Sequence, residues 1–157
     1  MIMERTNIFS VLDVAEIELS YKTKVKASSR PQVTSARSAY DILLKAWDEN
    51  KIEFVEEFKV LLLNRANKVL GIYQVSSGGV TGTVADPKLI FVAALKANAC
   101  SMILSHNHPS GSLSPSRQDE ELTRKICEAG KFLDIKVLDH LIITADSFYS
   151  FADEGIL

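Results

Sequence analysis

The stretch "SHNHPSGSLSPSRQDEE", Ser105–Glu121, lies between a short apolar run and an amphipathic one. His106 and His108, two of only three histidines in the chain, stand two residues apart in it, and Asp119 follows eleven residues after the second. The apolar "CSMIL" before it is typical of a buried strand, whereas the run 114–130 opens with Ser-Pro and is typical of a helix. Open α/β sheets place their functional sites in loops at the carboxyl ends of strands. The stretch therefore predicts an α/β fold with a functional loop between a strand and a helix.

The rest of the chain alternates predicted helices and strands. The spacing of apolar residues predicts a helix from Thr34 to about Asn50, capped by Thr34 or Ser35. Two β-rich runs, "EEFKVLLLN" and "VLGIYQVSS", are joined by "RANK" and predict a hairpin. Asp86 followed by Pro87 predicts the start of a second helix. Near the end of the chain, "IKVLDHLIIT" predicts a strand and "FYSFADEGIL" a short tail.

The predicted order is helix, strand, strand, helix, strand, helix, strand. Helices that alternate with strands imply a sheet covered on both faces, and the hairpin makes this sheet mixed rather than purely parallel. The sequence therefore predicts one three-layer α/β/α domain over residues 34–157, preceded by a strand-like arm over residues 1–33. A chain of 157 residues, 46% of them hydrophobic, is long and apolar enough for one such core.

Charge and composition exclude several classes of protein. The net charge of -2 provides no global basic field for nucleic acid. The run Lys22–Arg37 holds five cations and no acid, which indicates either an edge strand blunted by lysines or a strip that binds phosphates or acids. Two distant cysteines, Cys100 and Cys127, indicate a reducing compartment. Because no signal peptide or membrane-spanning run is visible, we expect a cytoplasmic protein with no membrane partner.

The two histidines and the aspartate have the spacing of a metal site. In extended backbone, residues two apart point the same way, so His106 and His108 can reach one ion. Asp119, in the first turns of the following helix, can supply a third ligand. Imidazole nitrogens with a carboxylate oxygen suit a divalent metal, zinc foremost, and three protein ligands leave a fourth position open, as in catalytic sites. Plainer interpretations stay open: exposed loop histidines, an acid placed favourably near a helix N-terminus, and Ser116 as an ordinary first-turn serine.

The pattern His-x-His-Pro, six residues, Ser, two residues, Asp resembles the JAMM motif of the JAB/MPN+ metalloprotease family. The segments "SHNHPSG", "PSRQDEELT", "FLDIKVLDHLII" and "EEFKVLLLNRANKVLG" are similar to its RadC branch, over roughly Thr34 to Gly155. The resemblance implies a JAB/MPN domain, similar in fold to cytidine deaminases, that hydrolyses an amide bond with the help of zinc. The first thirty residues contain no Gly-centred helical hairpin, so we expect a short form without the helix-hairpin-helix region of some longer relatives.

The resemblance also implies a role for each residue of the motif. His106, His108 and Asp119 would hold Zn²⁺, with a water molecule in the fourth place. Ser116 would supply an oxyanion donor or hold the zinc-bound water.

The general base of the resemblance is a glutamate from an earlier strand. Aligned on "ExF", this residue is Glu56, while the neighbouring Glu57 leaves the register ambiguous. His140, in "VLDHLII", is either a core histidine satisfied by one partner or an outer-shell group near the metal, together with Asp139.

We therefore predict a zinc-dependent hydrolase of the metallopeptidase or isopeptidase type, acting on a peptide or isopeptide substrate. The alternatives are a DNA-repair-associated or nucleic-acid-binding accessory protein, and a metal-binding interaction module without turnover. Zinc-dependent deamination is excluded, because that chemistry uses H-x-E and P-C-x-x-C, whereas His108 stands two residues after His106 and the chain has no CxxC.

Overall fold

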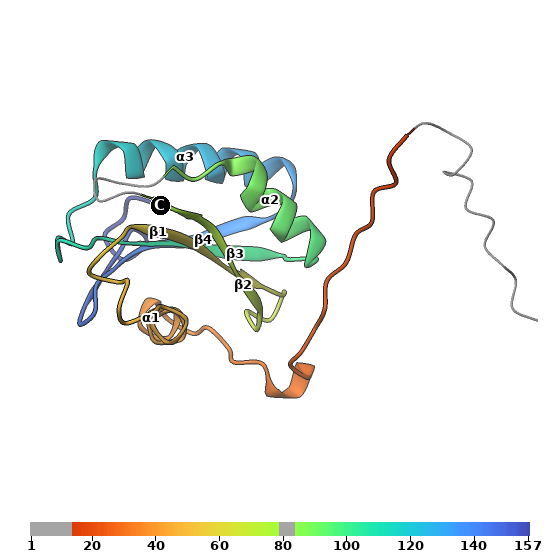
Figure 1. The fold of residues 1–157 in the computed structure, drawn as a ribbon, viewed down its shortest axis with the longest axis horizontal. Coiled ribbons are helices and arrows are strands. Elements are labelled where there is room, and N and C mark those ends of the chain that lie inside the picture. The colour runs from red at the N-terminus through yellow and green to blue at the C-terminus, as the bar shows by residue number, and fades with distance from the viewer. Residues whose placement is uncertain (1–13, 79–83) are drawn as a thin grey trace, which may run out of the picture.

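The computed structural model describes residues 14–78 and 84–157, and within them the chain folds into three layers around a mixed sheet. Helix α1 covers one face of the sheet, and α2 and α3 cover the other (Figure 1). The three-layer α/β/α prediction is thus confirmed. In chain order the elements are a 3₁₀ turn (Ala27–Ser29), α1 (Ala36–Lys45), β1 (Glu57–Leu63), β2 (Val69–Ser77), α2 (Pro87–Lys96), β3 (Ser101–Asn107), α3 (Arg117–Phe132), β4 (Lys136–Ile143) and β5 (Phe148–Ser150).

The strands of the described residues follow the order β2-β1-β3-β4-β5. The predicted hairpin is present as β1 and β2, and β1 also pairs antiparallel with β3. Strands β3 and β4 are parallel, joined by the crossover through α3, and β5 closes the sheet antiparallel to β4. Strand β5 falls within the expected tail; its three residues are too few to give an alternating pattern, and it forms because β4 offers an open edge.

Helix starts follow the expected capping chemistry with one exception. Ser35 caps α1, and Asp86 caps α2 with Pro87 behind it, as predicted. The third helix was expected to open at Ser114, but it begins at Arg117 with Ser116 as its N-cap. The physical reason is a capping box between Ser116 and the residue three positions later, which satisfies more backbone groups than a cap at Ser-Pro could.

The arm ahead of the domain contains no strand between residues 14 and 33; residues 1–13 lie outside the described part. Its regular structure there is the 3₁₀ turn, followed by an isolated antiparallel bridge between Gln32 and Lys68. The turn leads the chain away from β2 before the bridge can extend into a ladder. The expected strand is therefore absent from this part of the arm, while the boundary at residue 33 stays a prediction.

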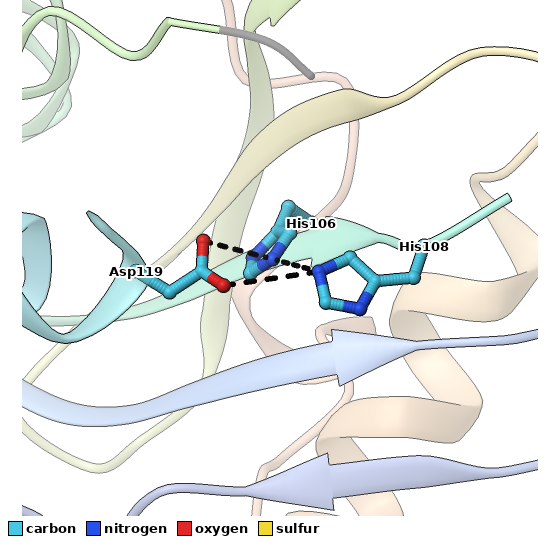
Figure 2. A group of neighbouring side chains, drawn as sticks. All are labelled: His106, His108 and Asp119. Atoms are coloured by element: carbon cyan, nitrogen blue, oxygen red, sulfur yellow. Dashed lines mark hydrogen bonds and ion pairs between the residues drawn. The ribbon is translucent and has the colours of Figure 1, made fainter. Parts of the chain in front are cut away.

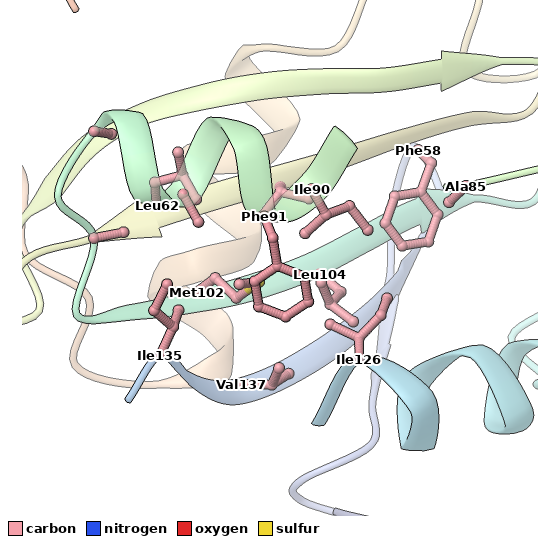
Figure 3. Close-up of a cluster of buried hydrophobic side chains, with 14 residues drawn as sticks. Phe58, Leu62, Ala85, Ile90, Phe91, Met102, Leu104, Ile126, Ile135 and Val137 are labelled. Carbon is pink, nitrogen blue, oxygen red and sulfur yellow. The ribbon is translucent and has the colours of Figure 1, made fainter. Parts of the chain in front are cut away.

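Two apolar clusters fill the layers. Strands β1 and β3 are buried at every position, as expected of central strands covered on both faces. Figure 3 shows the cluster between the sheet and the helices α2 and α3. Phe58, a member of this cluster, pairs with His106 at the end of β3. A second cluster lies between the sheet and α1. The two clusters thus pack β3 from both faces.

Among the described residues, no helix is long and apolar enough to cross a membrane.

The contact between α3 and the start of β4 leaves no room for a side chain at Gly130. A Cβ there would lie 2.3 Å from the backbone oxygen of Ile135, whereas a Cβ at Gly71 meets nothing within 4 Å. We predict that Gly130→Ala lowers the free energy of unfolding by about 1–3 kcal/mol, because the backbone must shift. The matched Gly71→Ala should leave it unchanged or slightly raised. Urea unfolding followed by circular dichroism measures both, and equal stability of the two variants would contradict the packing described.

Candidate metal centre

The carboxyl end of β3 and the first turn of α3 bring His106, His108 and Asp119 together (Figure 2). The Nε2 atoms of the two imidazoles are 3.0 Å apart. The carboxylate lies 3.3 Å from Nε2 of His106 through Oδ1, and 3.8 Å from Nε2 of His108 through Oδ2. One ligand atom from each residue falls within a group spanning at most 4.8 Å, so the three could hold one metal ion.

The residue between the two histidines anchors the loop on the other face. Asn107 is fully buried, and its side-chain amide donates to the carbonyls of Ile52 and Val55 at 2.7 and 2.9 Å. Its Oδ1 accepts the backbone N–H of Glu57 at 2.7 Å. Because side chains alternate along a strand, this anchorage directs His106 and His108 together to the opposite face.

A tight turn fixes the orientation of His108. Gly111 has a φ of +81°, a left-handed conformation that glycine adopts readily, and its N–H donates to the carbonyl of His108 at 2.9 Å. The turn returns the carbonyl of Ser112 to within 2.7 Å of Nδ1 of His108. A carbonyl can only accept, so Nδ1 carries the proton and Nε2 of His108 presents a lone pair to the centre.

Asp119 is held by the start of its own helix. The N–H of Ser116 donates to Oδ2 of Asp119 at 2.7 Å, and the N–H of Asp119 donates to Oγ of Ser116 at 3.1 Å. Burial raises the pKa of the Asp119 carboxyl, but the hydrogen bond and charge of His106 in its protonated form, together with the bonds from Ser116, outweigh it and hold the pKa well below its ordinary value. The carboxylate is therefore ionised and points at the two imidazoles.

A chain of hydrogen bonds decides which nitrogen of His106 is protonated. The hydroxyl of Thr123 donates to the backbone carbonyl of Asp119 at 2.6 Å, so its oxygen accepts Nδ1–H of His140, also at 2.6 Å. Nε2 of His140 then accepts Nδ1–H of His106 at 2.8 Å. Burial first, and the charge of His106 in its protonated form second, lower the pKa of His140 well below its usual value, so His140 is neutral as these hydrogen bonds require.

When His106 is neutral, its proton is on Nδ1, and the consequence is a cluster of acceptors. Nε2 of His106, Nε2 of His108 and the carboxylate of Asp119 then all offer lone pairs to the same point. Two imidazole lone pairs at 3.0 Å repel unless a proton or a metal cation lies between them. A set of two nitrogens and one carboxylate is chemically suited to a divalent metal, so the residues present fit such an ion.

Comparison with known proteins agrees with this site. The profile of the RadC-like JAB domain matches residues 33–156, most of the chain. This chain belongs to the RadC-like JAB domain family.

Curated relatives of this RadC-like JAB chain are bacterial. It is 44% identical over 144 residues to a UPF0758 protein of Flavobacterium johnsoniae, covering 91% of this chain and 62% of the relative. A UPF0758 protein of Porphyromonas gingivalis is 39% identical over 150 residues, with 94% and 65% covered. One from Symbiobacterium thermophilum is 34% identical over 144 residues, with 92% and 60% covered. The chain thus spans less than two thirds of the length of these relatives.

The two candidate bases of the RadC-like domain lie on different faces of the sheet. The Glu57 carboxylate is buried and lies 3.2 Å from Nζ of Lys59, which in turn sits over the ring of Trp47 on the α1 side. Glu56 precedes β1, and its carbonyl accepts the N–H of Gly78 at 2.8 Å, which continues the hairpin by one residue.

The register of β1 against β3 can be continued to Glu56. Phe58 pairs with His106, and its ring stacks on that imidazole with 6.0 Å between the ring centroids. Residues two apart share a face of a strand, so continuing the register one pair beyond β1 would bring Glu56 opposite His108, on the side of the histidines.

Sequence reasoning missed three contributors to this site. Thr123 lies four residues after Asp119 on α3, a spacing that one helix face allows but that many threonines share. Asn107 has no local signal of its buried contacts, and Phe151, in the expected tail, stacks on His140 with 4.7 Å between the ring centroids. Each acts through a partner distant in sequence, which no local pattern reveals.

Two other expected groups lie apart from the imidazoles. The Asp139 carboxylate accepts the backbone N–H of His140 at 2.7 Å and the hydroxyl of Ser150 at 2.6 Å, so it fastens β4 to β5. Burial raises the pKa of Asp139, and these hydrogen bonds oppose that rise. The basic strip Lys22–Arg37 belongs to the arm and to the start of α1, and contributes none of the three metal-binding side chains.

We predict that Thr123→Val weakens the binding of Zn²⁺ or Co²⁺ about 10- to 100-fold, because it removes the group that sets the His140 tautomer and hence that of His106. Competition with a chelating dye measures the affinity. Thr123→Ser keeps the hydroxyl and should bind as the unmodified protein does. If valine and serine at this position give the same affinity, the hydrogen-bond chain does not control the site.

Proposed function

We propose that this chain is a zinc-dependent hydrolase of the metallopeptidase or isopeptidase type. The observation that carries the proposal is the convergence of two imidazole nitrogens, each with its other ring nitrogen engaged in a hydrogen bond, and one carboxylate oxygen at the end of β3. Zinc in catalytic sites takes three such protein ligands and keeps a further position for water. Membership of the RadC-like JAB domain family supports the same class of chemistry.

Zinc is the metal that we propose, because two imidazoles and one carboxylate suit its borderline-soft character. When bound, it would lower the pKa of a water molecule to about 7, which supplies a nucleophile at neutral pH. His106, His108 and Asp119 would hold the ion. His140 and Thr123 would keep the His106 ring in the tautomer that leaves Nε2 available.

Glu56 is the proposed proton carrier. The continued register would bring it to the histidine side of the sheet, where a carboxylate can take the proton of the attacking water and later give it to the leaving amine. Glu57 cannot serve without breaking its buried pair with Lys59. The residue that the sequence motif favoured is thus also the one that the register supports.

Ser116 is the proposed donor to the carbonyl oxygen of the substrate. Its Oγ accepts the N–H of Asp119, an interaction that leaves the hydroxyl proton to donate elsewhere. A donor at the N-terminus of α3 also benefits from the partial positive charge of the helix. Ser116 would then stabilise the negative charge that develops on the oxygen during attack.

The bond cleaved is proposed to be an amide, in a peptide or between a side chain and a C-terminus. The names of the relatives specify no substrate, and the fold alone does not determine one. The DNA-repair-associated role and the non-catalytic metal module are the alternatives that the assay below separates from hydrolysis.

We predict that zinc-loaded protein cleaves members of a panel of fluorogenic peptide and isopeptide substrates, and that Glu56→Gln lowers kcat at least about 100-fold, since it removes the proton acceptor. Zinc content should stay the same, because Glu56 is not among the proposed ligands. Glu57→Gln is the matched control: it should lower stability through its pair with Lys59 yet keep most of the turnover.

Two outcomes contradict the proposal in different ways. Equal loss of activity in both variants would remove Glu56 from the role of base. Zinc-loaded protein that cleaves no member of the panel would favour a metal-binding module without turnover.

A further inference from the structure

The arm ahead of the domain has the pattern of a strand that faces water on one side. Between residues 15 and 26, apolar or β-branched side chains alternate strictly with polar ones, which is the period of a half-buried strand. The first set is Ala15, Ile17, Leu19, Tyr21, Thr23 and Val25, and the second is Glu16, Glu18, Ser20, Lys22, Lys24 and Lys26.

Among residues 14–78 and 84–157, nothing buries the apolar set. Ile17 is 86% exposed and Leu19 is 77% exposed, and the segment forms no strand within residues 14–33. In Figure 1 the arm runs out from the body of the domain without following the sheet. An exposed row of large apolar side chains in such a pattern indicates a missing partner.

The chain's own sheet cannot supply that partner in this arrangement. The bridge between Gln32 and Lys68 would, if continued, place Arg30 beside Leu70. Instead the 3₁₀ turn intervenes, and the hydroxyl of Tyr21 donates to the carbonyl of Leu70. The arm therefore crosses the edge of β2 at one point rather than running along it.

The charges of the arm fit a second copy of itself. Its first half is acidic, with Glu16 and Glu18, and its second half is basic, with Lys22, Lys24 and Lys26. In antiparallel self-pairing each glutamate faces a lysine of the other copy, whereas parallel pairing puts like charges together. Strand β2 has no charged residue to offer as an alternative partner.

We propose that residues 15–26 of two copies pair antiparallel around a two-fold axis centred on Ser20 or on Tyr21, and so form a dimer. The segment is self-complementary under that axis in both respects: apolar positions meet apolar ones, and acids meet bases. This is the property of an isologous interface, in which the same surface serves both subunits.

The paired arms also have an apolar surface to lie against. A two-stranded ribbon is marginally stable in water and needs cover on its apolar face. Tyr21 already lines a hollow of about 260 Å³ with Tyr73 of β2 and Val92 of α2. Next to it, Leu89, Val92 and Leu95 of α2 are 44%, 60% and 52% exposed. The ribbon covers this surface and buries its own apolar face in the same step.

Charge reversal tests the pairing in the 157-residue chain by sedimentation velocity, from micromolar to near-millimolar protein. The unmodified protein should shift from monomer to dimer with concentration. Glu16→Lys/Glu18→Lys makes the arm wholly basic, and Lys22→Glu/Lys24→Glu/Lys26→Glu makes it wholly acidic, so each variant alone should lose the dimer. Mixing the two should restore it as a heterodimer, and so should combining all five changes in one chain.

The matched control is Glu49→Lys/Glu53→Lys, which makes the same change of charge at two exposed positions outside the arm. It should dimerise as the unmodified protein does. An unmodified protein that stays monomeric at every concentration overturns the proposal. The same holds if it stays monomeric and its basic residues bind DNA instead. A dimer that persists in both reversed variants, or one that mixing fails to restore, also overturns it. Because the readout is mass, a failure here is independent of whether the metal centre hydrolyses a substrate.

Discussion

A single hydroxyl proton, that of Thr123, determines the chemistry of the candidate centre. It is donated to the backbone carbonyl of Asp119, and this forces the direction of the next two hydrogen bonds through His140 to His106. The result is that neutral His106 carries its proton on Nδ1 and presents the lone pair of Nε2. The carbonyl of Ser112 imposes the same state on His108 from the other side. Two uncharged acceptors and a carboxylate then face one another, which is favourable only around a cation.

The sheet is what makes this arrangement rigid. Strand β3 is buried along its whole length, and Asn107 fastens its end to the segment that leads into β1. That same fastening holds the backbone N–H of Glu57 at the start of β1. Ser116 has two roles: it caps the start of α3, and its backbone N–H holds the carboxylate of Asp119 in place. Asn107 and Ser116 therefore stabilise the fold and position the candidate ligands at the same time.

The sequence predicted the features that have local causes. Apolar periodicity located α1 and the β1–β2 hairpin, and the His-x-His spacing with Asp119 indicated three side chains that the structure brings within reach of one ion. Features that depend on distant partners were missed or misplaced: β5 forms because β4 has an open edge, and α3 starts at Arg117 because Ser116 and Asp119 cap each other. The tautomer chain through Thr123 needs a helix and two strands to meet, which no local spacing encodes.

The most direct test of the acceptor cluster is the metal content of protein purified without a histidine tag, measured by plasma mass spectrometry beside His106→Ala/His108→Ala. We predict close to one metal ion per chain in the unmodified protein and none in the variant, with the circular dichroism spectrum unchanged. Absence of metal from both proteins, even after reconstitution with zinc, would contradict the assignment of these three side chains as a metal centre.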